Sequence, residues 1–121
     1  MMKFEAKPDM HASIVHLPEK MVMAQTPTFR AAIIDYIDRG NTRLVFDLQA
    51  LQYIDSSGLS VLISARNQVK KYSGEVVLLN PTPSVLALIE LTRLHLIMEI
   101  YETEEQALIA LRFDQNEKQA V

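Results

Sequence analysis

Two adjacent serines follow an aspartate at the start of a helical pattern, and this arrangement suits the binding, sensing or removal of a phosphate. The stretch reads Tyr53-Ile54-Asp55-Ser56-Ser57-Gly58-Leu59-Ser60. An apolar, β-prone run at residues 44–48 precedes it. Apolar residues at helical spacing follow it, namely Leu59, Leu62, Ile63 and Val69. We therefore expect the hydroxyls at a helix N-terminus, where unpaired backbone N–H groups and the positive end of the helix dipole favour an anion.

Asp55 and Ser56 also suit a purely structural role. Aspartate and serine are common N-cap residues, and a cap alone contributes about 1 kcal/mol to helix stability. N-caps occur on most helices, whereas phosphoserines occur on few. Local chemistry by itself therefore favours simple capping over a modified serine, and other features of the chain must decide between them.

The composition of the chain indicates one domain whose partners are proteins. The chain has 121 residues, of which 49% are hydrophobic, enough for a single core. Its formal charge of -3 comes from 15 acidic and 12 basic residues, so no large basic field is available for nucleic acid or a membrane surface. The absence of cysteine excludes disulfides, thiolate nucleophiles and cysteine-ligated metals. We expect a cytoplasmic protein.

The ends of the chain predict neither a secretory signal nor a membrane segment. Charged residues interrupt residues 1–9 every few positions, and no stretch approaches the roughly 20 apolar residues that cross a bilayer. Residues 114–121 are polar. We predict a domain at residues 1–113 followed by a polar C-terminal tail at residues 114–121.

Strand and helix patterns alternate along the chain in the order ββαβαβαβα. Strands are predicted at residues 4–6, 13–17, 44–48, 76–79 and 97–100, with a turn at Pro8-Asp9. Helices are predicted to begin at N-caps Thr26 and Thr82, each followed by proline, at the serine stretch, and at a capping box from Thr103 to Gln106. The order predicts an α/β fold with a mixed, mostly parallel sheet and helices packed against it.

A series of segments matches one known domain in order and spacing. They are Leu17-Pro18-Glu19-Lys20, Thr26-Pro27-Thr28-Phe29-Arg30, Leu44-Val45-Phe46-Asp47-Leu48, Ile54-Asp55-Ser56-Ser57-Gly58-Leu59, Pro81-Thr82-Pro83-Ser84-Val85 and Glu104-Glu105-Gln106-Ala107-Leu108. Together they resemble the STAS domain, named for sulfate transporters and anti-sigma factor antagonists, and in particular the small single-domain bacterial antagonists. The resemblance spans nearly the whole chain and implies the STAS fold.

The resemblance also implies a phosphorylation switch centred on Ser56. In such antagonists the first serine after the aspartate is phosphorylated by a partner serine kinase that is also the anti-sigma factor; Ser57 is the second choice. The unmodified form would bind the kinase and release a sigma factor, and a phosphoserine phosphatase would reset the modified form. The implied protein is a binding module without cofactor, metal or catalytic residue, and a monomer or weak dimer.

The implied partner surface comprises the helix start and a preceding loop. Its residues are Asp55, Ser56, Ser57, Gly58, Leu59, Met21, Val22 and Met23. Many antagonists have an aspartate in that loop, at or near the position of Val22. The apolar loop is either an adaptable docking surface, because methionine fits varied partners, or part of the core. Arg93 stands where many relatives have glycine, which implies a local loop difference.

Two other functions remain open at this point. A constitutive assembly subunit of a stress-signalling particle or lipid-transport complex would use the same surface without phosphorylation, and Val22 favours it. A hydrolase centred on Ser57 would need a histidine and an acid nearby, but the G-x-S-x-G pattern is absent.

The sequence predicts neither a metal site nor a nucleotide site. His11 and His16 are separated by an odd number of positions and are poor joint metal ligands. With neither G-x-G-x-x-G nor a P-loop, ATP and Mg²⁺ would belong to the kinase.

Overall fold

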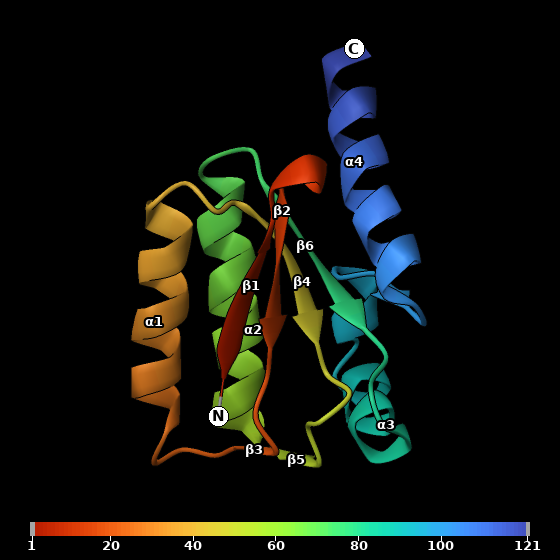
Figure 1. Cartoon of the computed structure of the whole chain (residues 1–121). Helices are drawn as coiled ribbons and strands as arrows, with labels where there is room; N and C mark the ends of the chain where they lie inside the picture. Colours follow the sequence, from red (N-terminus) through yellow and green to blue (C-terminus); the bar gives the residue numbers. More distant parts are fainter. Residues whose placement is uncertain (1, 121) are drawn as a thin grey trace.

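A mixed five-stranded sheet forms the centre of the protein. The structure is a computed structural model, which describes the backbone of residues 2–120 and the side chains of residues 2–112. The strands are β1 (Lys3–Lys7), β2 (Ala12–His16), β4 (Arg43–Asp47), β6 (Glu75–Leu79) and β7 (Ile100–Tyr101), in the spatial order β1-β2-β4-β6-β7. Only the β1–β2 pair of this sheet is antiparallel. The predicted mixed, mostly parallel α/β fold is confirmed (Figure 1).

A second, two-stranded sheet lies at the end of the main sheet where α2 begins (Figure 1). Its parallel strands are β3 (Lys20–Met21) and β5 (Tyr53–Ile54), which pair Lys20 with Tyr53 and Met21 with Ile54. The sequence pattern did not predict these strands, because two residues are too few to show a period. Apart from them and two short 3₁₀ helices, the observed order is the predicted ββαβαβαβα.

Helices cover both faces of the sheet. Helices α1 (Thr26–Asp38) and α2 (Ser56–Lys70) lie side by side on one face, and α4 (Glu104–Ala120) lies on the other (Figure 1). Helix α3 (Pro83–Leu91) contributes buried residues to the core on the α1 and α2 side. The backbone at residues 114–120, predicted as the start of a polar tail, continues α4, and its side chains lie outside the described residues.

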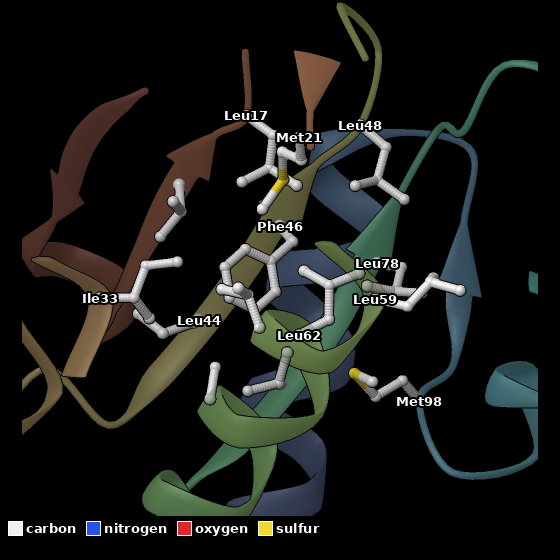
Figure 2. Close-up of a cluster of buried hydrophobic side chains, with 14 of the residues drawn as sticks. Leu17, Met21, Ile33, Leu44, Phe46, Leu48, Leu59, Leu62, Leu78 and Met98 are labelled. Carbon is white, nitrogen blue, oxygen red and sulfur yellow. The ribbon is translucent and has the colours of Figure 1, made fainter. Parts of the chain in front are cut away.

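The core consists of two apolar clusters separated by the sheet. Phe46 lies in the larger cluster, with Ile33 of α1 and Leu62 of α2 (Figure 2). The smaller cluster joins Val45 to Ala107 of α4. Neighbouring residues of a strand point to opposite faces, so a strand covered on both faces is continuously apolar. This explains why residues 44–46 of β4 are apolar without a break, whereas Asp47 at the end of the strand is only half-buried.

Helix starts differ locally from their predictions. Helix α1 begins at Thr26 itself, with Gln25 in the N-cap position, and the Thr26 hydroxyl donates to the carbonyl of Met23 at 3.2 Å. Thr82 does occupy the N-cap position of α3, but its hydroxyl donates to the carbonyl of Leu51 instead. Thr103 accepts from the backbone N–H of Gln106 at 3.2 Å, as half of the predicted capping box requires.

The last strand lies further along the chain than predicted. Residues 94–96 form the 3₁₀ helix η2, and β7 overlaps the predicted strand at residues 97–100 only at Ile100. Arg93, immediately before η2, has φ of 61°, in the left-handed region. A non-glycine residue there costs about 1 kcal/mol. The turn therefore gives a physical reason for the glycine that the family resemblance implies at this position. The predicted turn at Pro8-Asp9 is the 3₁₀ helix η1 (Pro8–Met10).

Candidate functional site

Asp55 caps the helix that carries the serines. Its Oδ1 accepts from the backbone N–H of Gly58 at 3.0 Å, and its carbonyl accepts from the N–H of Leu59 at 3.0 Å. Two of the first N–H groups of α2 are therefore satisfied by one residue. The capping prediction is confirmed for Asp55, and Ser56 is the first residue of the helix.

The same carboxylate also holds the loop that follows β3. Asp55 Oδ2 accepts from the backbone N–H of Met23 at 3.0 Å, and the N–H of Asp55 donates to the carbonyl of Met21 at 3.2 Å. Asp55 thus fixes two segments that are about thirty residues apart in sequence. Sequence reasoning missed this bridge, because nothing local to residues 21–23 indicates their partner.

Gly58 allows a close approach between α2 and the small sheet. A Cβ atom at this position would lie 2.5 Å from Ile54 Cγ1 and 2.7 Å from the carbonyl oxygen of Met21. The second contact is with backbone, which moves only if β3 moves. Gly58 is buried, so its observed contribution to the site is to let the helix start sit against β3.

The two candidate phosphate acceptors differ in exposure. Ser56 is exposed in the first turn of α2, whereas Ser57 is half-buried. The carbonyl of Ser57 accepts from the hydroxyl of Ser60 at 2.6 Å, and that hydroxyl accepts from Arg30 Nη2 of α1 at 2.8 Å. The Ser57 side of the helix therefore faces α1, and the Ser56 side chain is the more accessible of the two.

The predicted apolar surface at residues 21–23 is divided by the fold. Met21 is completely buried in the core (Figure 2), Val22 is half-buried, and Met23 is 70% exposed. Leu59 is also buried. The expectation that the side chains of Met21 and Leu59 lie on a partner surface is therefore corrected, because both pack inside the domain.

The surface around Ser56 includes one aromatic residue that the sequence reasoning passed over. Tyr53 is exposed in β5, directly before the buried Ile54. The alternation of a strand provides the missed signal, since a buried Ile54 turns its neighbour outward. A cavity of about 520 Å³ lies beside the loop, lined by Pro18, Glu19, Lys20, Gln25 and Phe29. We use the name α2 surface for the exposed residues Tyr53, Met23 and Ser56 together with the accessible parts of Val22 and Ser57.

In the described part of the chain, the site has neither a histidine bonded to Ser57 nor a cluster of metal ligands. The ring nitrogens of His16 contact Asp47 and Glu5, and no hydrogen bond joins a histidine to Ser57 among the described residues. Those residues also contain no group of three or more His, Asp or Glu placed to hold a metal ion. No helix within them combines the length and apolarity needed to cross a bilayer.

The fold and the start of α2 are consistent with one known domain family. The family model of the STAS domain matches residues 3–107. The chain belongs to the STAS domain family.

Its relatives in that family are described as antagonists of anti-sigma factors. BtrV of Bordetella bronchiseptica, described as a candidate anti-sigma factor antagonist, is 30% identical over 89 residues, which are 74% of this chain and 77% of BtrV. The anti-sigma F factor antagonist of Paenibacillus polymyxa is 35% identical over 68 residues, which are 56% of this chain and 58% of the relative. The latter alignment covers little more than half of either chain.

Solved structures share the fold over almost the whole length. An anti-sigma factor antagonist from Mycobacterium paratuberculosis superposes with a TM-score of 0.82 at 26% identity, covering 93% of both chains. The anti-sigma factor antagonist SpoIIAA in its unphosphorylated form has a TM-score of 0.79 at 24% identity, covering 93% of this chain and 96% of SpoIIAA. The phosphorylated form of the Bacillus SpoIIAA has a TM-score of 0.71 at 23% identity, covering 93% and 100%.

Proposed function

We propose that this protein is a binding module that Ser56 phosphorylation switches off. In its unmodified form the α2 surface binds an anti-sigma factor that is also a serine kinase, and the phosphorylated form is released. The exposure of the Ser56 hydroxyl at the start of α2 carries the proposal, because a kinase must reach the acceptor oxygen. The names of the relatives supply the partner, and a SpoIIAA structure in a phosphorylated form is a precedent for the modification in this fold.

Ser56 is the proposed acceptor and Ser57 the second choice. Ser57 is half-buried on the side where Arg30 and Ser60 form hydrogen bonds, so phosphate there would disturb the α1–α2 contact. Phosphate on Ser56 would project from the first turn into solvent. The first-turn N–H groups and the helix dipole favour the anion, so the modified domain stays folded.

The switch acts through charge at the docking surface. Phosphorylation adds about -1.5 to -2 charges at pH 7. The new charge stands one residue along the chain from Asp55, whose carboxylate holds the backbone N–H of the exposed Met23. A partner that packs on Met23 and Tyr53 must then desolvate a dianion. Each 1.4 kcal/mol of lost binding free energy lowers affinity about tenfold, so a few kcal/mol suffices. A phosphoserine phosphatase would restore the unmodified form.

The proposed setting is the cytoplasm, with a monomer or weak dimer as the binding form.

A constitutive assembly subunit is the alternative function. The apolar loop favours it, because Val22 stands where the family resemblance implies an aspartate. The exposed Met23 and Tyr53 would serve such a subunit equally well. The two functions differ in one respect: only the switch requires that charge on Ser56 abolish binding.

Phosphate mapping and a matched pair of charge variants test the proposal. The protein is incubated with an anti-sigma serine kinase from its own source and with ATP and Mg²⁺, and the phosphate is located by mass spectrometry. Binding to that kinase is then measured for Ser56→Asp and Ser84→Asp. Ser84 is the matched control, because it is also exposed in the first turn of a helix, α3.

We expect phosphate on Ser56, at least tenfold weaker binding of Ser56→Asp, and unchanged binding of Ser84→Asp. Phosphate on Ser57 alone would move the switch to the second choice. If neither serine carries phosphate and Ser56→Asp binds as tightly as the wild type, the switch is refuted and the constitutive assembly function takes its place.

A further inference from the structure

His16, the last residue of β2, lies between two carboxylates on the neighbouring strands β1 and β4. Its Nδ1 is 2.8 Å from Asp47 Oδ2 of β4, and its Nε2 is 2.8 Å from Glu5 Oε1 of β1. The three side chains share the sheet face on which α4 packs, because Ile14 and Val45, two residues before His16 and Asp47, both contact α4 in the smaller core cluster.

Both contacts require a protonated ring. Ionised carboxylates only accept hydrogen bonds, and a neutral imidazole has a single N–H to donate. An arrangement with a carboxylate oxygen at 2.8 Å from each ring nitrogen is therefore that of an imidazolium donating twice. We call His16, Glu5 and Asp47 the histidine clamp.

The clamp joins the edge strand to the rest of the sheet. Lys7 of β1 extends it, with Nζ 2.8 Å from Glu5 Oε2 and 3.5 Å from Glu104 Oε2 of α4. Asp47 is fixed on its other side, since Oδ1 accepts from the backbone N–H of Gln49 at 3.0 Å. The side chains are partly exposed, so solvent protons reach the ring directly.

We propose that His16 is a proton-dependent clamp that anchors the edge strand β1 through Glu5 when its ring is protonated and releases Glu5 when the ring is neutral. Loss of the proton leaves one ring nitrogen with a lone pair facing a carboxylate oxygen, so one contact must open. Glu5 opens first. Its side chain is 45% exposed against 16% for Asp47, and it keeps Lys7 as a partner, whereas Asp47 stays fixed by Gln49.

The charged groups around the ring favour the protonated form. Those on β1 are Glu5, Lys7 and Lys3, which is opposite His16 in the pairing of β1 and β2; β4 contributes Asp47, and α4 contributes Glu104 beyond Lys7. Burial alone would lower the pKa of His16, but the hydrogen bonds to Glu5 and Asp47 outweigh burial and raise it above 6.5. The hydrogen bonds of Glu5 to Lys7 and then to His16 lower the pKa of Glu5 below 4.5.

These directions define the pH range in which the clamp holds. The contribution of His16 is complete below its unfolded pKa near 6.5 and disappears as pH rises through its higher folded pKa. The contribution of Glu5 is complete above its unfolded pKa near 4.5 and disappears as pH falls through its lower folded pKa. The clamp is therefore fully closed between about pH 4.5 and pH 6.5 and opens as pH rises through the raised pKa of His16.

Hydrogen exchange of the β1 amides tests the clamp independently of any binding partner. Protection factors of the described β1 amides, corrected for intrinsic exchange, are measured from pH 6 to pH 9.5 for the wild type, His16→Gln and His95→Gln. His95 is the matched control, because it is exposed in η2, away from the clamp. We expect β1 protection in the wild type and in His95→Gln to fall about fivefold over this range relative to β6, and His16→Gln to lack that fall.

Equal pH dependence of β1 protection in all three proteins would overturn the proposal. Glu5→Gln provides a second route should His16→Gln not fold, since the Glu5 side chain is 45% exposed and its carboxylate contacts only His16 and Lys7 among the ion pairs of the described residues. Nuclear magnetic resonance titration of the His16 ring must then give a lower pKa in Glu5→Gln than in the wild type. An unchanged pKa would also overturn the proposal.

Discussion

Replacing Asp55 separates the two tasks of its carboxylate. Asp55→Ala removes both the cap on Gly58 N–H and the hydrogen bond to Met23 N–H. Loss of an N-cap side chain costs about 1 kcal/mol. Loss of a carboxylate acceptor from a backbone N–H at this partly exposed position costs about 1 kcal/mol more. We therefore expect Asp55→Ala to lower the free energy of unfolding by about 2 kcal/mol.

Asp55→Asn distinguishes the two contributions. Asparagine caps helices as well as aspartate does, so its amide oxygen can keep the bond to Gly58 N–H. Its NH₂ group then replaces Oδ2 and meets Met23 N–H, which is also a donor. We expect a loss of about 1 kcal/mol, half that of Asp55→Ala.

Urea unfolding followed by circular dichroism provides the measurement, with Thr103→Ala as the reference for a single cap. The Thr103 hydroxyl accepts from the Gln106 N–H at the start of α4, so its removal should cost about 1 kcal/mol. A loss for Asp55→Ala no larger than that for Thr103→Ala would refute the reasoning that Asp55 acts at two places. Wild-type stability of Asp55→Asn would refute the contribution of the Met23 contact.

Three further outcomes follow from the packing and the charges. Gly58→Ala should lose about 2 kcal/mol, because its Cβ would meet the backbone of Met21; an unchanged melting temperature would contradict this. Phe46→Ala, at the centre of the core (Figure 2), should lose about 4 kcal/mol in urea unfolding, whereas the exposed Tyr53→Ala should lose less than about 0.5 kcal/mol; similar losses would contradict the assigned burial. His16→Gln should destabilise the domain more at pH 6 than at pH 9, because the pKa of His16 is raised by folding; an equal loss at both values would count against the raised pKa.

The fold was largely predictable because its signals are local. The strand predicted at residues 44–48 is apolar except at Asp47, and the helix from Thr26 has a start signal and a face formed by Ile33 and Ile37, both completely buried. The two-residue strands β3 and β5 were not predictable, since each is too short to show a pattern and they pair across about thirty residues of chain. Ile63 has helical spacing with core residues, yet it is 39% exposed, because periodicity does not define how wide the buried face of a helix is.

The candidate site was predictable in position but not in its contacts. The pattern of Asp55, Ser56 and Gly58 places an anion-compatible helix start after a strand, and α2 does start there. The apolar residues 21–23 looked alike in sequence, and only packing placed Met21 in the core and Met23 at the surface. Met21 belongs to β3 and packs in the core, whereas Met23 lies in the loop that follows the strand.

The sequence by itself determined the order of the main-sheet strands and the helices, the capped start of α2 and the resemblance to a family, because capping and hydrophobic periodicity act over a few residues. The tertiary structure alone decided that Asp55 joins α2 to the loop after β3 and that His16 lies between Glu5 and Asp47. These contacts join residues 11 to 32 positions apart. They form only where strand pairing brings those segments together, and no local pattern along the chain specifies that geometry.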